Sequence, residues 1–184
     1  DTILDMLRRK PLNILSMDGA LQPNNALDDA PAVEIEAPDN LCGERDRLLF
    51  TSGNRLLAIA SNGIEEIARF NTALTALALA PGGEMAIALD TGLLRLMARD
   101  CALRDLAPPS TLNCVTALAF DAKGALYVTQ GSARHAAGDW AVDLMERNAE
   151  GSVWRIDPAT GTAAALHQGL AFPNGLLVQA NGAG

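Results

Sequence analysis

Two side chains of this 184-residue sequence have a type and setting suited to chemistry. His135 lies in the stretch Gly131–Glu150 and could act as a general base, because an imidazole titrates near neutral pH. The alternative is an exposed loop histidine without a catalytic partner. Asn174 lies between Pro173 and Gly175, where its amide oxygen could bind a hard cation while the glycine lets the backbone approach. The same tripeptide also favours a simple turn, so both interpretations stay open.

Composition and motifs exclude several other chemistries. Cys42, Cys101 and Cys114 are widely spaced without a Cys-x-x-Cys pair, which argues against zinc ribbons, iron–sulfur clusters and disulfide frameworks. The sequence has no Gly-x-Ser-x-Gly, His-Glu-x-x-His or Walker motif. The formal net charge of -8 argues against nucleic acid as a partner. No apolar run approaches the roughly 20 residues of a membrane span. The sequence leaves the compartment of the protein open.

The elements that must position these residues recur along the chain. Residues 1–33 are predicted to form an N-terminal extension with a short helix. From residue 34, short alternating apolar segments are separated by Gly, Asn and Asp turns, which is typical of strands. The segments repeat as units, and the insertion Gly131–Glu150 lengthens the third of them. Equivalent positions in the units are marked by Leu41, Leu77, Leu118 and Leu176.

Four short antiparallel strands in a unit of about 40 residues are typical of a propeller blade. Met85–Leu89 supports this interpretation, because a middle strand covered on both faces can be apolar on both. The sequence therefore predicts an all-β fold of the six-bladed β-propeller type, with about three blades and the start of a fourth. This incomplete propeller covers residues 34–184, with blades near 39–74, 75–113, 114–172 and from 173 onward. A β-sandwich is the competing fold, but it would not explain the recurring order of strands and turns.

A six-bladed ring needs about twice as many residues as this chain offers. We therefore expect the remainder of the propeller to come from the same chain or from another chain. Assembly of two or more copies of this segment is a further alternative.

The stretch from Gly131 to Leu176, with its motifs GSVWRIDPATG and FPNG, resembles the strictosidine-synthase-like proteins. It is also similar to the wider superfamily of gluconolactonase/regucalcin, paraoxonase and diisopropylfluorophosphatase propellers. This resemblance implies a six-bladed propeller with a divalent cation, usually calcium, at the top of its central channel. In the hydrolytic members the ion polarises a lactone, ester or phosphotriester.

The resemblance also implies a set of metal ligands. Asn174 matches the family's metal-binding asparagine, and Glu36 in the segment EAPDN is similar to the family's first-blade glutamate, although alanine replaces the following glycine. The family's second asparagine falls on Thr116, which is a poorer cation ligand. Asn113 could substitute for it from the loop, but its odd offset along the strand points to the opposite face. The fourth ligand, an aspartate, belongs to a later blade.

A pocket at the same end of the channel is expected to include Asp39, Asn40, Thr116 and Trp140. Trp140 belongs to the insertion, where it either walls the pocket or pins the insertion to the propeller body. The leading hypothesis is a metal-dependent hydrolase of small esters or lactones, with calcium or another divalent cation as cofactor and His135 as candidate catalytic residue. The alternative is a non-catalytic propeller that binds a small ligand or a protein partner, because fold alone does not decide function.

Overall fold

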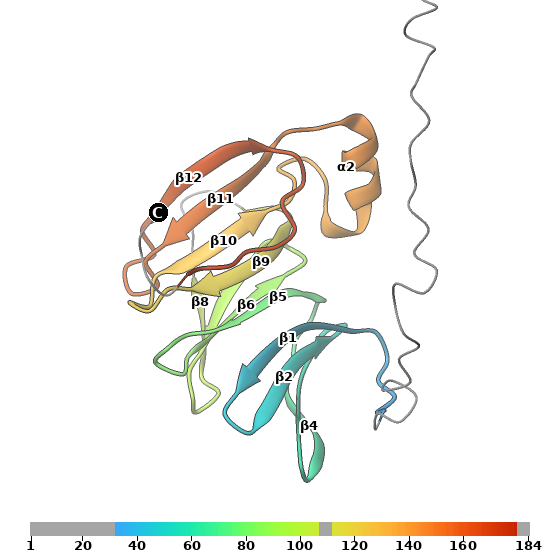
Figure 1. The fold of residues 1–184 in the computed structure, drawn as a ribbon, viewed down its shortest axis with the longest axis vertical. Coiled ribbons are helices and arrows are strands. Elements are labelled where there is room, and N and C mark those ends of the chain that lie inside the picture. The colour runs from blue at the N-terminus through green and yellow to red at the C-terminus, as the bar shows by residue number, and fades with distance from the viewer. Residues whose placement is uncertain (1–31, 107–111, 180–184) are drawn as a thin grey trace, which may run out of the picture. The chain divides into compact units, whose positions relative to one another are not determined.

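Three four-stranded antiparallel sheets make up the part of the chain that the computed structural model describes, residues 32–106 and 112–179 (Figure 1). The predicted extension 1–33 and its helix lie outside the described residues, apart from residues 32 and 33. Within each sheet, every strand pairs with the next one along the chain. The predicted all-β fold is confirmed, and the three sheets are those of a partial β-propeller.

The strands are short, from four to eight residues. The first sheet contains β1 (Pro38–Glu44), β2 (Arg47–Ser52), β3 (Arg55–Ala60) and β4 (Gly63–Arg69). The second contains β5 (Leu74–Leu79), β6 (Met85–Leu89), β7 (Leu94–Met97) and β8 (Leu103–Leu106). The third contains β9 (Val115–Phe120), β10 (Leu126–Gln130), β11 (Gly151–Ile156) and β12 (Ala163–Leu170).

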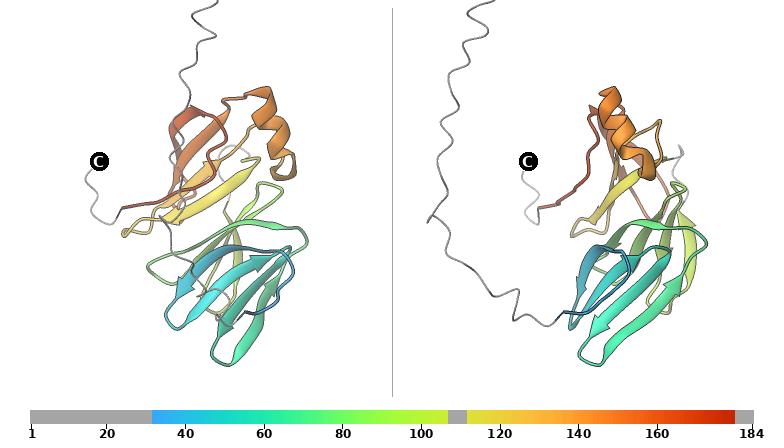
Figure 2. Two further views of the ribbon diagram at one scale, coloured as in Figure 1. Left: turned by 45° about the vertical axis from the view of Figure 1, so that its right-hand side comes forward. Right: turned by 90° about the vertical axis from the view of Figure 1, so that its right-hand side faces the viewer.

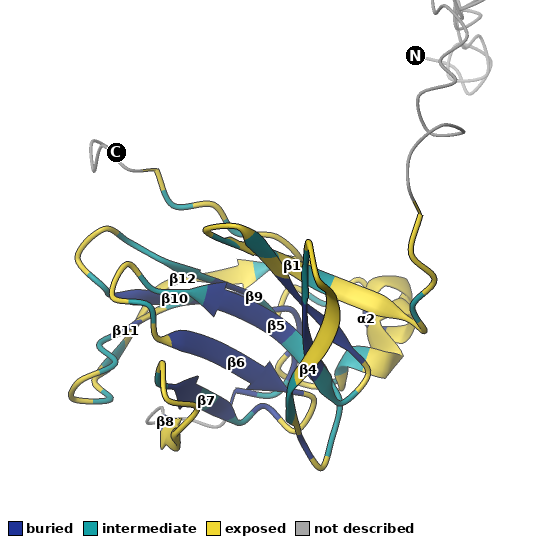
Figure 3. Cartoon of the chain, turned by 90° about the horizontal axis from the view of Figure 1, so that it is seen from below, coloured by how far each residue is buried: buried dark blue, intermediate teal, exposed yellow. Residues whose placement is uncertain are grey.

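The strands β5, β6 and β7 of the second sheet are largely buried, and β6 is buried at every position (Figure 3). Met85, Ile87 and Leu89 belong to an apolar cluster shared with the first sheet. The alternate residues Ala86 and Ala88 belong to a cluster shared with the third sheet, which contributes larger side chains such as Leu126 and Val128. This alternation follows from the period of two in a strand. The prediction that Met85–Leu89 is covered on both faces is therefore confirmed.

The first strands of the sheets lie next to one another, since β5 contacts both β1 and β9 (Figure 2). Residues 171–179 follow β12 and form no strand. Val178 and Gln179 nevertheless line a cavity together with Leu79 and Phe120, at the C-terminal ends of β5 and β9. This segment thus runs beside the inner strands, where a fourth blade would begin. The blade boundaries and the count of six blades stay predictions.

The predicted insertion lies between β10 and β11. It contains a short 3-10 helix η1 (Ala137–Asp139) and the helix α2 (Trp140–Glu146). The left-handed residue Arg147 ends α2, and its backbone N–H donates to carbonyl groups of the last turn. None of the helices within residues 32–106 and 112–179 is long and apolar enough to cross a membrane.

Gly92, in the turn between β6 and β7, makes a close backbone contact with the segment that precedes β9. Its φ is +80°, and a Cβ atom there would collide with the backbone carbonyl of the buried Leu112. We expect Gly92→Ala to lower the free energy of unfolding by more than the roughly 1–2 kcal/mol of a left-handed backbone alone. Urea denaturation followed by circular dichroism measures this change.

Gly53→Ala is the matched control for that variant. Gly53 also has a positive φ, +59°, but a Cβ atom there would have no neighbour within 4 Å. We expect only the backbone cost, about 1–2 kcal/mol. Equal losses in the two variants would contradict the close packing of Gly92 on Leu112.

Candidate functional site

A pocket of about 640 Å³ lies at the N-terminal ends of β1, β5 and β9. It gathers Asp39, Asn40, Thr116 and Trp140, the four residues predicted to line a pocket, and also the predicted metal ligand Asn174. The remaining lining residues are Leu74, Thr75, Cys114, Val115, Ala137, Leu144 and Phe172. Residues from all three sheets, the insertion and the segment after β12 therefore meet at one place.

Each inner strand carries a β-bulge at this end. The register shifts leave Asn40 in β1, Thr75 in β5 and Thr116 in β9 as the extra, unpaired residues. A bulge bends its strand and re-aims a side chain, and such features are frequent next to binding sites. All three bulge residues line the pocket. The fold thus brings one polar bulge residue from each sheet to the same pocket.

On the first sheet, Thr51 holds the bulge in place. Its buried hydroxyl donates to the Asp39 carbonyl at 3.0 Å and accepts a hydrogen bond from Asn40 Nδ2 at 3.1 Å. Asn40 has a φ of +45°, which asparagine tolerates better than most residues. The Asn40 backbone N–H donates to Asp39 Oδ1 at 2.8 Å. The second carboxylate oxygen of Asp39 makes no hydrogen bond with the described residues, so it can accept one from a ligand.

On the third sheet, Thr116 holds the segment that carries Asn174. The Thr116 hydroxyl donates to the Pro173 carbonyl at 2.6 Å and lies 3.0 Å from the Thr129 hydroxyl. Pro173 also packs closely on Gly151, where no Cβ would fit. A Cβ at Gly175 would have no protein neighbour within 4 Å, and the expected approach of its backbone to a cation stays a prediction. Thr116 therefore acts on the backbone before Asn174.

Thr75 is a polar pocket residue that the sequence analysis missed. Its Oγ1 is buried and has no hydrogen-bond partner among the described residues. An unsatisfied buried polar atom is uncommon and calls for a partner such as water or a ligand. The sequence did contain a signal, because Thr75 opens the segment TALAL just as Thr116 opens the equivalent segment TALAF.

A buried polar network fixes the insertion above the third sheet. Trp154 Nε1 donates to Ser152 Oγ at 2.8 Å, and Ser152 donates to Gln130 Oε1 at 3.1 Å. At the adjoining end of β10, Ser132 Oγ donates to the buried carboxylate of Asp143 on α2 at 2.6 Å. Buried polar groups in low-dielectric surroundings strongly disfavour alternative arrangements once they are paired. The network thereby sets where Trp140 and Leu144 of α2 meet the pocket.

Three predicted site residues do not line this pocket. Glu36 is exposed, and its backbone carbonyl accepts a hydrogen bond from Ser52 Oγ at 2.6 Å. Asn113 Nδ2 donates to the His135 carbonyl at 3.0 Å and so fastens the start of the insertion. His135 Nε2 lies 2.9 Å from Glu146 Oε2. The hydrogen bond from His135, with a second one from Asn148, lowers the pKa of Glu146 below its usual range.

Cys114 lines the pocket but is poorly suited to nucleophilic chemistry. Burial raises the pKa of its thiol, and the nearby Asp143 carboxylate raises it further, against opposing backbone hydrogen bonds from Ser132 and Gly131. The thiolate is the reactive form of cysteine. Cys114 therefore stays a thiol at neutral pH and serves as a pocket wall.

The oxygen atoms that line the pocket are of the type that binds hard cations. They comprise the Asp39 carboxylate and the side-chain amides of Asn40 and Asn174. Calcium takes six to eight oxygen ligands, which is more than these side chains supply. Within residues 32–106 and 112–179, no group of three or more His, Cys, Asp or Glu residues is arranged to hold a metal ion.

Solved structures similar to this chain are β-propellers of several kinds. A gluconolactonase-like protein matches with a TM-score of 0.56 at 15% identity, over 74% of this chain and 50% of the other. Virginiamycin B lyase from Staphylococcus aureus matches with a TM-score of 0.50 at 14% identity, over 72% of this chain and 43% of the lyase. The extracellular domain of a one-component system from B. thetaiotaomicron matches with a TM-score of 0.51 at 12% identity, over 71% and 16%. These likenesses define the fold.

The family comparison is more particular. Residues 116–183 match the family model described as strictosidine synthase. The resemblance to strictosidine-synthase-like and gluconolactonase propellers is thereby confirmed for this part of the chain. No curated protein matches the sequence. The chain spans half or less of the length of the three structures above.

Removing one hydroxyl tests how Asn174 is held. Thr116→Val keeps the side-chain shape and deletes the donor to the Pro173 carbonyl, a hydrogen bond of about 1 kcal/mol. We expect chymotrypsin to cleave after Leu176 or Leu177 several-fold faster, as measured by mass spectrometry of the fragments, because the segment loses its anchor. Thr51→Val deletes the donor to the Asp39 carbonyl and should leave this cleavage unchanged. An unchanged cleavage rate in Thr116→Val would contradict this account.

Proposed function

We propose that this chain forms the ligand-binding end of a β-propeller hydrolase that acts on small esters or lactones with a divalent cation, calcium being the first candidate. The observation that carries the proposal is the convergence of three bulge residues with Asp39 and Asn174 on one pocket. Its volume falls within the range typical of small-molecule sites, about 300–1,000 Å³.

The cation would be held by the Asp39 carboxylate and the amide oxygens of Asn40 and Asn174. Further ligands would come from water or from parts of the propeller beyond the described residues; Glu36 and Asn113 remain predicted ligands that do not line the pocket. When bound, such an ion supplies Lewis-acid polarisation of a carbonyl oxygen.

The other residues of the pocket would bind and orient the substrate. The unpartnered Thr75 hydroxyl can donate a hydrogen bond to a substrate oxygen. Trp140, Leu144 and Phe172 supply an apolar surface for the body of an ester or lactone. His135 stays a candidate base that needs a rearranged insertion, because its Nε2 faces Glu146.

A second candidate is a propeller that binds a small ligand without catalysis. It is favoured by Thr116, because the family resemblance implies a metal-binding asparagine at this position and because the threonine hydroxyl donates to the Pro173 carbonyl. A pocket with too few cation ligands can still bind a neutral polar molecule through the same oxygens and hydroxyls.

Calcium dependence separates these two functions. On the complete natural chain that contains these residues, we expect calcium added after EDTA treatment to raise the melting temperature, with about 2.7 kcal/mol of stabilisation at a hundredfold excess over Kd. Asp39→Asn should raise the apparent Kd for calcium, obtained from the rise in melting temperature, at least tenfold. Asp90→Asn removes an exposed carboxylate in the turn after β6 and should leave the response unchanged.

The same samples are assayed for hydrolysis of γ-butyrolactone and phenyl acetate. Hydrolysis that is abolished by EDTA and restored by calcium is the expected result. Hydrolysis that persists in EDTA would contradict the metal dependence. A chain that shows neither a calcium shift nor hydrolysis would favour the non-catalytic function.

Thr75 gives an independent prediction. Because its hydroxyl has no partner, Thr75→Val should keep or raise the melting temperature while lowering kcat/KM for the lactone about tenfold. Thr72 is the matched control, since its Oγ1 is also buried and unpartnered but does not line the pocket. Thr72→Val should leave both stability and turnover near the wild-type values. Equal turnover in the two variants would remove Thr75 from the site.

A further inference from the structure

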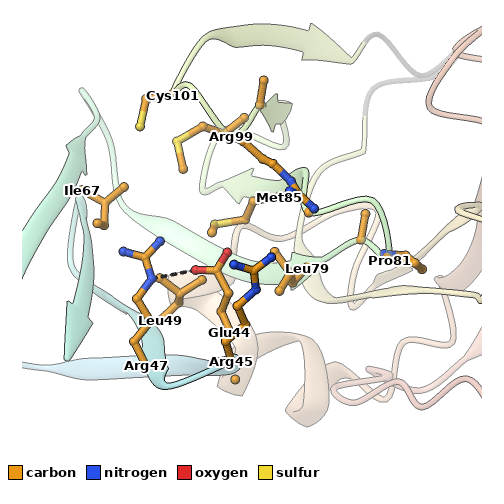
Figure 4. A pocket seen from close by; sticks show the side chains of 15 residues that line it. Glu44, Arg45, Arg47, Leu49, Ile67, Leu79, Pro81, Met85, Arg99 and Cys101 are labelled. Atoms are coloured by element: carbon orange, nitrogen blue, oxygen red, sulfur yellow. Dashed lines mark hydrogen bonds and ion pairs between the residues drawn. The ribbon is translucent and has the colours of Figure 1, made fainter. Parts of the chain in front are cut away.

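A second cavity, of about 560 Å³, lies between the first and second sheets at the opposite end of β1 (Figure 4). It is lined by Glu44 at the end of this strand, whereas Asp39 near its start belongs to the pocket described above. Four residues lie between the two, and the five steps along an extended strand span about 17 Å. The two cavities share no lining residue, so this one needs its own explanation.

Three arginines and one carboxylate line the cavity: Arg45, Arg47, Arg99 and Glu44. Arg47 is already neutralised, because its Nε lies 2.7 Å from Glu44 and a terminal nitrogen lies 2.8 Å from Glu65. Arg45 and Arg99 form no ion pair with any residue of the described segments. The cavity therefore carries two cationic groups without an anionic partner.

Arg99 is an exposed residue whose side chain is held by a backbone hydrogen bond. Its Nε donates to the Gly82 carbonyl at 3.0 Å, which leaves the terminal nitrogens of the guanidinium as donors. The guanidinium packs against Gly83, where a Cβ atom would collide with it. Arg45 lies in the turn between β1 and β2, with a φ of +51°. Figure 4 shows Arg99 reaching in from the second sheet and Arg45 rising from the first.

The walls between these arginines are apolar. Leu49, Met85 and Met97 are at most 5% exposed, and they face the cavity together with Ile67 and Leu79. Methionine side chains adapt to ligands of different outline, because they are unbranched and polarisable. Cations beside an apolar wall are complementary to a molecule with one anionic group and one apolar body.

We propose that this cavity is a binding site for a small organic carboxylate with an apolar tail or ring. A guanidinium presents a planar fork of donors that matches a carboxylate, and such charge-assisted hydrogen bonds are strong. An organic ammonium ion fits poorly, since the carboxylate of Glu44 is already paired with Arg47. The chain as a whole has a net charge of -8. The two unpaired arginines make this cavity locally positive, and a locally positive cavity attracts anions.

Isothermal titration calorimetry of the complete natural chain with octanoate tests the site. We expect saturable binding at one site, with 1-octanol and octylammonium binding at least tenfold more weakly. Arg99→Gln, and Arg45→Asn with a side chain that tolerates the left-handed backbone, should each weaken octanoate about tenfold. Arg95→Gln is the control, because it removes an arginine of the second sheet that pairs with Asp105 outside the cavity.

Circular dichroism and melting temperature establish that each variant is folded. Should Arg99→Gln fail to fold, Arg99→Lys keeps the charge, loses the planar fork and should weaken octanoate several-fold. Octanol that binds as tightly as octanoate would overturn the proposal, since adsorption to exposed apolar surface would then explain the heat. An equal loss in Arg95→Gln, unchanged affinity in both cavity variants, or no octanoate binding would overturn it as well. None of these outcomes depends on calcium or on lactone hydrolysis.

Discussion

Apolar contact on both faces of the second sheet is the constraint on which the rest of the structure depends. β6 offers large side chains such as Ile87 to the first sheet and small ones such as Ala88 to the third, which fills the space with Leu126 and Val128. A close-packed interior resists changes of even one methylene group. The spacing of the three sheets is therefore fixed by these residues, and β1, β5 and β9 are held side by side as a consequence.

In strands held in this way, a backbone irregularity is needed to direct polar side chains into one pocket. Regular strands would send neighbouring residues to opposite faces. The bulges at Asn40, Thr75 and Thr116 break that alternation at equivalent places, and hydroxyl groups of Thr51 and Thr116 then lock the adjoining backbone. The pocket is thus formed by bulges in strands that are otherwise held by apolar packing. This explains why the pocket is polar although the interior between the sheets is apolar.

The sequence predicted the fold well, because repetition and alternation are local signals that survive without knowledge of contacts. It also grouped Asp39, Asn40 and Thr116, which lie at equivalent places in their units, with Trp140, which lies in the insertion expected over the same end. It missed Thr75, because a threonine at the start of a strand is also an ordinary strand residue. Whether the side chains of Glu36, Asn113 and His135 reach the pocket depends on hydrogen bonds within connecting loops, which no periodicity encodes. The sequence did not predict the cavity lined by Arg45 and Arg99 either, because this cavity forms only where two sheets pack together.

The two ends of the sheets carry different side chains because different segments of the chain meet there. At one end, short oxygen-bearing side chains such as Asp39 and Thr75 sit directly on the strands, where little freedom remains. Such rigid donors suit a small polar ligand whose geometry must be controlled. At the other end, hairpin turns carry the long side chains of Arg45 and Arg99 beside an apolar wall. A guanidinium presents a planar fork of donors to an anion, and the methionines of the apolar wall adapt to ligands of varied outline. In the two proposals made above, a single set of strands therefore separates a site that would select for geometry from one that would select for charge.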